Sequence, residues 1–237
     1  MFNFNKNKKR IDISNEPRKD LLIDKSFDST EIEAYKTIRT SLYFSLVHHA
    51  GCKRLLMASS VSKEGKTTVC VNLAKTVAQT DSKVLVIDCD LRKPRIHRFF
   101  KSKSIPGLTN YLIGQSTLEE IIKSTDTPNL SVIYSGLIPP NPAEVLASTE
   151  FKQLVEELSK KYDYIFFDCA PLLEVSDALE VSKFIDGVIL IARQNYTSHN
   201  FINQTLKKLE FANIKVFGFI LNDMPKKKNR YYYRYIT

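Results

Sequence analysis

The sequence predicts an α/β fold of three layers, in which helices cover both faces of a mostly parallel sheet. Short, nearly continuous apolar runs, typical of strands buried on both faces, alternate with segments of helical apolar spacing. The strands are expected at residues 54–58, 83–88, 130–134, 162–168, 187–192 and 216–221. The helices are expected at residues 30–49, 69–79, 107–114, 117–124, 150–161, 176–184 and 198–211. A chain of 237 residues, 43% of them hydrophobic, suits one large domain of this kind or two small ones.

The net charge of +9 is concentrated at the two ends of the chain. The first ten residues contain four basic side chains and no acid, and residues 226–237 contain five basic side chains and no acid. The long region between them is neutral, so the sequence predicts no basic surface for nucleic acid. Two basic ends suit the anionic face of a membrane or an acidic partner, and ordinary solvated chain ends are the other explanation.

The chain is expected to divide into three parts. Residues 1–29 lack periodicity and predict a flexible N-terminal arm, residues 30–223 form the folded domain, and residues 224–237 form a disordered, basic, tyrosine-rich tail. No apolar run reaches the about 18 residues of a membrane span, and the Asn/Lys-rich start has no signal-peptide core. The four cysteines form no Cys-x-x-Cys pair, so we expect reduced thiols in a cytosolic protein.

The rest of the chain is organised around the segment Ser-Ser-Val-Ser-Lys-Glu-Gly-Lys-Thr-Thr at residues 59–68. It follows a predicted strand and opens a predicted helix, which is the context of a phosphate-binding P-loop. Backbone N–H groups and the dipole at the start of the helix favour a phosphate there. In this interpretation Lys66 contacts the phosphates and the Thr67 hydroxyl holds Mg²⁺. Ser60 replaces the usual first glycine, and an ordinary strand-to-helix turn is the alternative.

Two predicted strands end in acidic residues, at the edge where parallel sheets bind ligands. The strand at 83–88 ends in Asp88, with Asp90 two residues later, and the strand at 162–168 ends in Asp168. Asp168 suits the water shell of Mg²⁺, and a turn-forming aspartate is the alternative. A basic segment follows Asp90, facing a phosphate, an acidic partner or only solvent. Its members are Arg92, Lys93, Arg95, Arg98, Lys101 and Lys103.

The first predicted helix is expected to begin at Thr30, because Thr30 and Glu33 have the spacing of a capping box. Its apolar residues share one face: Tyr35, Ile38, Leu42 and Leu46. Glu33, Lys36 and Arg39 follow one another at intervals of three residues. From the residues alone, this stripe suits a solvated surface with weak local pairing.

The last seven residues contain four tyrosines mixed with basic residues: Tyr231, Tyr232, Tyr233 and Tyr235. Such a segment does not suit a core strand of an α/β sheet. It suits stacking on single-stranded nucleic acid, a membrane interface, or phosphorylation. The clustering of tyrosines at an accessible end of the chain favours phosphorylation.

Together these motifs resemble the bacterial tyrosine kinases of capsule and exopolysaccharide production, which belong to the P-loop ATPases with deviant Walker motifs. The resemblance covers nearly the whole chain, from Glu31 to the tail. It rests on Glu-Gly-Lys-Thr-Thr at 64–68, Val-Leu-Val-Ile-Asp-Cys-Asp-Leu-Arg-Lys-Pro at 84–94, Pro-Pro-Asn-Pro-Ala-Glu at 139–144, Phe-Phe-Asp-Cys-Ala-Pro at 166–171 and the terminal tyrosines. It implies a three-layer P-loop NTPase fold and an ATP-dependent protein-tyrosine autokinase that regulates polysaccharide polymerisation and export.

The resemblance also implies roles for individual residues. It assigns catalysis to Lys66, Asp88, Asp90 and Asp168, with Asp88 or Asp90 helping to activate the attacking tyrosine hydroxyl. It assigns Mg²⁺ to Thr67, Asp88 and Asp168. ATP contacts fall to Ser62, Lys63, Glu64, Gly65, Lys66, Thr67, Thr68 and Asn222. The tail tyrosines become autophosphorylation sites, and Glu33, Lys36 and Arg39 become the interface of a homo-oligomeric ring.

The family works with a membrane-spanning partner, often a separate polypeptide, whose cytoplasmic end activates the kinase. Because no membrane span is expected here, the resemblance implies a cytoplasmic kinase that a separate activator and polysaccharide co-polymerase recruits to the inner face of the membrane. It also implies a cognate tyrosine phosphatase and no nucleic-acid partner.

Two departures from the family pattern bear on activity. Ser62 and Lys63 replace a Pro-Gly pair, and a side chain at 63 restricts the backbone if φ is positive there. Lys36 replaces an arginine of the interface motif and lacks its bidentate fork. Two alternatives remain. One is a membrane- or DNA-associated positioning ATPase, although the position of the signature lysine of that group is occupied by Val61 here. The other is a nucleotide-gated adaptor without catalysis.

Overall fold

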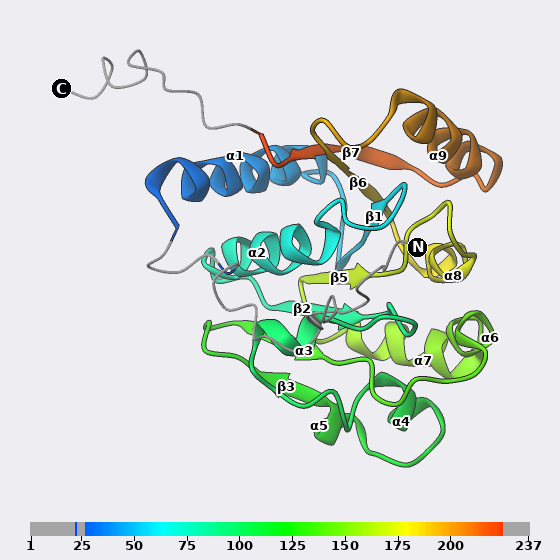
Figure 1. Cartoon of the computed structure of the whole chain (residues 1–237). Coiled ribbons are helices and arrows are strands. Elements are labelled where there is room, and N and C mark those ends of the chain that lie inside the picture. Colours follow the sequence, from blue (N-terminus) through cyan, green and yellow to red (C-terminus); the bar gives the residue numbers. More distant parts are fainter. Residues whose placement is uncertain (1–21, 23–26, 225–237) are drawn as a thin grey trace, which may run out of the picture.

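The computed structural model describes Leu22 and residues 27–224 of the chain. Its strands are β1 (Lys53–Ser59), β2 (Val84–Asp88), β3 (Ile122–Ser124), β4 (Leu130–Ile133), β5 (Tyr164–Asp168), β6 (Gly187–Arg193) and β7 (Val216–Asn222). They form one seven-stranded sheet in the order β3-β4-β2-β5-β1-β6-β7 (Figure 1). All neighbouring strands run parallel except β3, which pairs antiparallel with β4. The predicted mostly parallel sheet is therefore confirmed.

Helices cover both faces of this sheet, as predicted (Figure 1). One layer consists of α1 (Ser29–Ser45), α2 (Lys66–Ala78) and α3 (Ile96–Phe99). The other consists of α4 (Leu108–Leu112), α5 (Leu118–Ile121), α6 (Pro142–Leu146), α7 (Thr149–Leu158), α8 (Asp177–Val181) and α9 (His199–Phe211).

The central strands are apolar throughout because both of their faces are covered. In β1, Leu55 and Met57 join the apolar cluster of the first helical layer, and Leu56 and Ala58 join that of the second. All four side chains are fully buried. Since β1, β2 and β5 are parallel neighbours, their carboxyl ends meet at one edge of the sheet, which is where the site lies.

Two predicted helices differ from the structure. The helix expected over 117–124 ends at Ile121, and Ile122–Ser124 instead form the edge strand β3. Pairing with β3 uses backbone groups that β4 would otherwise leave exposed at the edge of the sheet. The helix expected over 176–184 is α8 followed by a short 3₁₀ turn, Ser182–Phe184.

The first helix has a capping box, but it lies two residues before the predicted one. The N-cap is Asp28, whose side chain accepts a hydrogen bond from the Glu31 N–H at 2.9 Å. Glu31 accepts one from the Asp28 N–H at 3.2 Å in return. Thr30 therefore lies inside the helix. Aspartate and threonine both suit an N-cap, so the local pattern did not distinguish the two starts.

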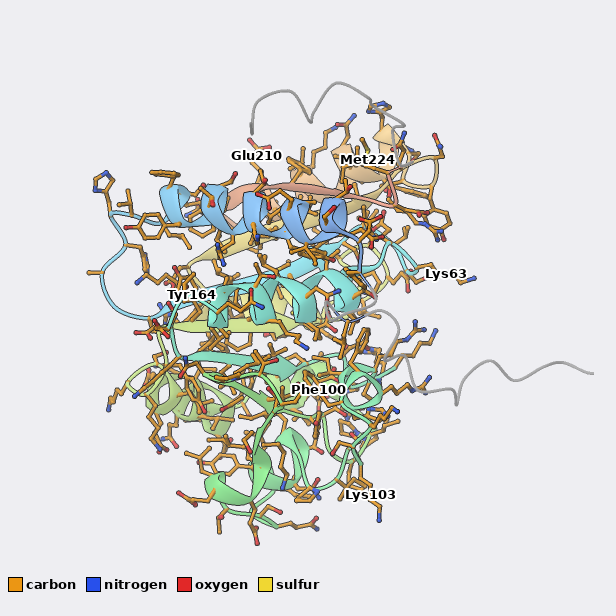
Figure 2. All side chains as sticks on the ribbon, turned by 90° about the vertical axis from the view of Figure 1, so that its left-hand side faces the viewer. Lys63, Phe100, Lys103, Tyr164, Glu210 and Met224 are labelled. Atoms are coloured by element: carbon orange, nitrogen blue, oxygen red, sulfur yellow. The ribbon has the colours of Figure 1, made fainter. Side chains whose placement is uncertain are left out.

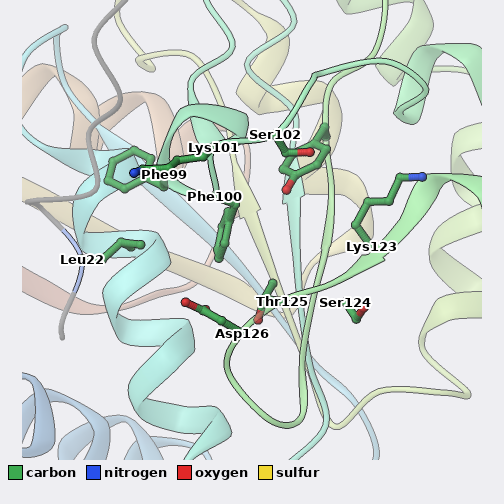
Figure 3. Close-up of a pocket in the computed structure, with 10 residues that line it drawn as sticks. Leu22, Phe99, Phe100, Lys101, Ser102, Lys123, Ser124, Thr125 and Asp126 are labelled. Atoms are coloured by element: carbon green, nitrogen blue, oxygen red, sulfur yellow. The ribbon is translucent and has the colours of Figure 1, made fainter.

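The helices α1 and α2 lie side by side on one face of the sheet (Figure 2). Leu22, from the N-terminal segment, is 2% exposed and joins the apolar cluster beneath them. It also lines a hollow of about 320 Å³ beside Phe99 and Asp126 (Figure 3). The predicted N-terminal arm thus meets the domain at Leu22. Within residues 22 and 27–224, no helix has the length and apolarity needed to cross a membrane.

Candidate functional site

The P-loop connects β1 to α2, and two of its residues have left-handed backbone conformations. Gly65 has φ +88°, and a β-carbon there would lie 2.1 Å from Nδ2 of Asn222. Both the backbone and the available space therefore require glycine. Lys63 has φ +69°, and its exposed side chain points away from the domain (Figure 2). Position 63 thus has the positive φ that makes the replacement of glycine by lysine costly.

Glu64 braces the P-loop from inside the protein. Its buried side chain accepts hydrogen bonds from the Val61 N–H at 3.0 Å and from the Thr197 hydroxyl. Its carbonyl oxygen accepts a hydrogen bond from Asn222 Nδ2 at 3.0 Å. The end of β7 and the connection after β6 therefore hold the loop in shape. The Glu64 side chain serves the loop itself rather than a ligand.

The P-loop residues that depart from the usual pattern have partners of their own. The Thr205 hydroxyl donates to the Ser60 hydroxyl at 2.8 Å, a contact that glycine lacks. The Ser62 N–H donates to Glu174 Oε1 at 2.6 Å, and a proline at this position would have no N–H to donate. These two hydrogen bonds help to hold the loop in shape at positions where the usual pattern has glycine or proline.

A buried ion pair forms the floor of the site. Lys66 Nζ donates to Asp168 Oδ1, and the two side chains are 7% and 1% exposed. Burial lowers the pKa of the Lys66 amine, but attraction to Asp168 and Asp90 outweighs it and leaves the pKa above its usual value. Lys66 is therefore positively charged at neutral pH, as contact with a phosphate requires.

Asp88 lies beside this pair but serves the backbone. It sits opposite Asp168 in the β2–β5 register and is fully buried. Its carboxylate accepts hydrogen bonds from the N–H groups of Asp90, Arg95 and Ile96 at 3.3, 3.2 and 3.1 Å. Burial, Asp168 and Asp90 raise the pKa of Asp88 well above its usual value. Asp88 thus shapes the loop after β2, while Asp90 lines the cavity above it.

Two of the three residues assigned to Mg²⁺ fit a hard cation with oxygen ligands. Asp168 Oδ2 is buried and has no hydrogen-bond partner among the described residues, a costly state that a neighbouring cation would relieve. Burial raises the pKa of Asp168, and Lys66 and Thr67 partly offset this effect. Thr67 lines the cavity in the first turn of α2. Asp88 fits less well, because backbone N–H groups already occupy its carboxylate.

A cavity of about 620 Å³ lies above these groups and is positively charged around its rim. Besides Lys66, its basic residues are Lys63, Arg92, Lys93, Arg95 and Arg193. Arg92 is held by Asp177, which is fully buried, through bonds of 2.8 and 3.0 Å. Arg193 links the Lys63 carbonyl, at 3.3 Å, to the carboxylate of Asp223. Cations around a carboxylate floor suit a polyphosphate that carries a metal ion.

The structure brings together the predicted P-loop residues, the strand-end acids and Asn222. It adds residues that the sequence analysis did not assign: Glu174, Asp177, Arg193 and Thr197. Arg193 is the last residue of β6. Its position at the end of a strand, the signal that pointed to Asp88 and Asp168, could therefore have identified it as well. Glu174 and Thr197 lie in connections where no sequence pattern marks contact with the P-loop.

The residues predicted to form an interface divide into two groups. Glu33 and Lys36 are exposed on α1 and form an ion pair of 3.3 Å within the helix. Arg39 instead donates from Nη1 to the Thr76 carbonyl of α2 at 3.0 Å. Only the first two side chains therefore face outward freely. The tail tyrosines, Tyr231, Tyr232, Tyr233 and Tyr235, lie outside the described residues.

Comparisons with known proteins agree with this geometry. A sequence-family model described as an AAA domain matches residues 62–216. The tyrosine-protein kinase Ptk of Acinetobacter johnsonii is 39% identical over 212 residues, which are 89% of this chain and 29% of the relative. The tyrosine-protein kinase YwqD of Bacillus subtilis is 36% identical over 209 residues, or 88% of each chain. The solved kinase domain of Escherichia coli tyrosine kinase ETK has a TM-score of 0.79 and 34% identity, covering 85% of this chain and 78% of that one.

The chain thus spans 29% of the Acinetobacter relative but 88% of the Bacillus relative. These relatives are named as kinases, which favours the kinase interpretation over a positioning ATPase. The P-loop and the fold as a whole agree with these comparisons. The chain belongs to the family of bacterial tyrosine-protein kinases of capsule and exopolysaccharide systems.

Proposed function

We propose that this chain transfers the γ-phosphoryl group of ATP to the tyrosines of its own C-terminal tail, in a neighbouring subunit of a ring. The observation that carries the proposal is the Lys66–Asp168 pair beneath a cavity that Asp90 lines and basic residues surround. Phosphoryl transfer depends mainly on placement and charge neutralisation, and this site offers both.

Individual residues have different roles in the proposed phosphoryl transfer. Lys66, Arg92 and Arg193 bind phosphate oxygens, and the N-terminus of α2 adds its backbone N–H groups. Thr67 and Asp168 would hold Mg²⁺, which would supply positive charge against the phosphates. The phenol oxygen bonds to the γ-phosphorus as the bond to the β,γ-bridging oxygen breaks, and ADP leaves.

The phenolic proton needs an acceptor, because a tyrosine pKa near 10 keeps the hydroxyl protonated at neutral pH. We assign this role to Asp90. It lines the cavity, whereas Asp88 is fully buried and accepts three backbone hydrogen bonds. Of the two residues that the sequence left open, Asp88 and Asp90, these contacts favour Asp90.

The residues directly before the tail, Asn222 and Asp223, lie at the P-loop. Asn222 contacts Glu64, and Asp223 pairs with Arg193, which also contacts Lys63. Tyr231 follows Asp223 by eight positions, and a flexible linker of that length has an r.m.s. span of about 16 Å. The length of the linker alone therefore does not exclude transfer within the same subunit. We retain transfer between subunits because α1 exposes Glu33 and Lys36, two positions of the charged motif with which the family assembles rings.

Phosphorylation would reverse the charge of the tail. Each phosphate adds about −1.5 to −2 charges, so four outweigh the five basic residues of 226–237. The unmodified tail is attracted to the anionic inner face of the membrane, and the phosphorylated tail is repelled by it and by its neighbours. A separate membrane-spanning activator brings the kinase there, and a cognate phosphatase resets it, so the cycle regulates polysaccharide polymerisation and export.

Mixing two variants tests transfer between subunits. One chain carries Lys66→Met with Asp168→Asn, is checked for folding and keeps the native tail. The other is active but has phenylalanine at all four tail tyrosines. With ATP, Mg²⁺ and the activating partner, phosphotyrosine is expected on the inactive chain. If wild type labels itself while the mixed inactive chain never does, transfer occurs within one subunit. If wild type binds ATP and labels no tyrosine, the kinase proposal itself fails.

A further inference from the structure

A second cavity, of about 830 Å³, lies directly beside the nucleotide cavity. One wall is basic and comes from the segment that follows Asp90: Lys93, Arg95 and Arg98. Three aliphatic side chains also line it and form what we call its apolar wall: Ile105, Leu137 and Ile138. We call this cavity the basic groove. The sequence alone left open whether its basic segment faces a ligand or only solvent.

The positive charge of the basic groove is not balanced within the described part of the chain. None of the described residues that line it is acidic. Lys93, Arg95 and Arg98 form no ion pair in residues 22 and 27–224, whereas Arg92 at the boundary of the groove is paired with Asp177. Uncompensated cations in a concave surface attract an anionic partner.

The apolar wall indicates that the partner has aliphatic groups as well as negative charge. Ile105, Leu137 and Ile138 are 51%, 42% and 64% exposed, unusually high for three neighbouring aliphatic side chains. Their segments are tied together, since the Gly136 N–H donates to the Ser104 carbonyl at 3.2 Å. A nucleic acid or a lipid headgroup would use the basic wall and leave this wall in water. A peptide with acidic and aliphatic side chains uses both walls.

The basic groove and the nucleotide cavity are continuous. Arg92, Lys93 and Arg95 line both of them. The backbone of this shared segment is fixed by Asp88, which accepts the Arg95 and Ile96 N–H groups. A peptide in the groove is therefore held at a defined position relative to the phosphates, as positioning catalysis requires.

We propose that the basic groove binds an acidic and aliphatic segment of a separate protein substrate and places a neighbouring tyrosine at the γ-phosphate. The inference rests on the proposed kinase function, and its transfer step is the one written above, with the phenolic proton passing to Asp90. The chain's own tail does not suit the groove, because residues 226–237 carry five basic side chains and no acid. Tail labelling and substrate labelling therefore depend on different surfaces.

The test uses three synthetic peptides, each with one tyrosine. The first has glutamates and a leucine beside the tyrosine, the second has glutamine for glutamate, and the third has serine for leucine. The variants are Arg98→Glu and Ile138→Asp, which change the groove and not the nucleotide cavity. Lys160→Glu is the matched control, because Lys160 is exposed and lines neither cavity.

Arg98→Glu is expected to lower kcat/KM for the glutamate peptide about tenfold, through KM, because like charges then face each other. The glutamine peptide should change little. Ile138→Asp should affect the leucine peptide more than the serine peptide. Lys160→Glu should resemble wild type, and both groove variants should keep nucleotide affinity and tail labelling. Equal use of the glutamate and glutamine peptides by wild type, or no effect of Arg98→Glu, would overturn the proposal.

Direct binding separates this proposal from the kinase function. Fluorescence anisotropy of the labelled glutamate peptide measures groove affinity whether or not any phosphate is transferred. Binding that Arg98→Glu weakens, in a chain that labels no tyrosine, supports the groove and contradicts the kinase proposal. An anionic oligonucleotide or vesicle that loses binding in Arg98→Glu, while the peptide does not, assigns the surface to that partner and overturns the inference.

Discussion

At the scale of single residues, the P-loop holds a lysine where its backbone favours glycine. Lys63 has φ +69°, which costs a residue with a β-carbon about 1–2 kcal/mol. Lys63→Gly removes that cost, and the greater flexibility of glycine in the unfolded chain cancels about 0.4–1 kcal/mol of the gain. We expect the free energy of unfolding, measured in urea, to rise by about 0.5–1 kcal/mol. Lys63→Ala keeps the β-carbon and should give no gain, so equal effects of the two substitutions would contradict this explanation.

Lys66 has a structural role as well as a proposed catalytic one. Within residues 22 and 27–224, Lys66 donates the hydrogen bond that the buried Asp168 Oδ1 accepts, and Oδ2 accepts none. Lys66→Met leaves that carboxylate buried without a counter-charge, and breaking such a pair costs about 3–5 kcal/mol. Thermal unfolding should show a clear loss of stability in Lys66→Met and recovery in Lys66→Met with Asp168→Asn. A single variant as stable as wild type would show that the pair contributes little.

At the scale of secondary-structure elements, the start of α1 depends on one side chain. Asp28 caps the helix and exchanges hydrogen bonds with Glu31, whereas Thr30 is already helical. Asp28→Ala should lower the free energy of unfolding by about 1 kcal/mol, a typical loss for an N-cap. Thr30→Ala should change it by a few tenths at most, because alanine is the better helix former. The opposite order in urea titrations would restore Thr30 as the cap.

The elements also differ in how well the sequence predicts them. The strands and the P-loop were predictable because burial on both faces and a strand-to-helix turn leave local signals. The capping residue of α1 and the edge strand β3 were not, since Asp28 and Thr30 compete at close range and β3 exists only because β4 lies beside it. Contacts such as Ser62 to Glu174, which are 112 residues apart, depend on tertiary packing alone.

At the scale of the whole molecule, the site concentrates acidic groups and ties stability to pH. Burial and the neighbouring carboxylates, Asp168 and Asp90, raise the pKa of Asp88, and burial raises that of Asp168. Between the unfolded pKa, about 3.9, and the raised folded values, the native state binds more protons than the unfolded state. Stability of the nucleotide-free protein should therefore fall as pH rises through that window.

Asp90→Asn tests this dependence, because the Asp90 charge raises the pKa values of both Asp88 and Asp168. The melting temperature without nucleotide should rise in the variant, and rise more at pH 8 than at pH 5. An increase of equal size at both pH values would mean that charge repulsion is not its cause. The same variant should also lose tyrosine phosphorylation, since the proposed proton acceptor is gone.

The central claim is that this P-loop site phosphorylates tyrosine, and one measurement tests it most directly. Purified chain is incubated with γ-labelled ATP, Mg²⁺ and the cytoplasmic part of the proposed activating partner, and the labelled residues are mapped by mass spectrometry. The account predicts label on tyrosines within 231–235 of wild type, and none on Lys66→Met with Asp168→Asn, checked for folding. Label on a folded variant of that kind, or none on wild type that demonstrably binds ATP, would contradict it.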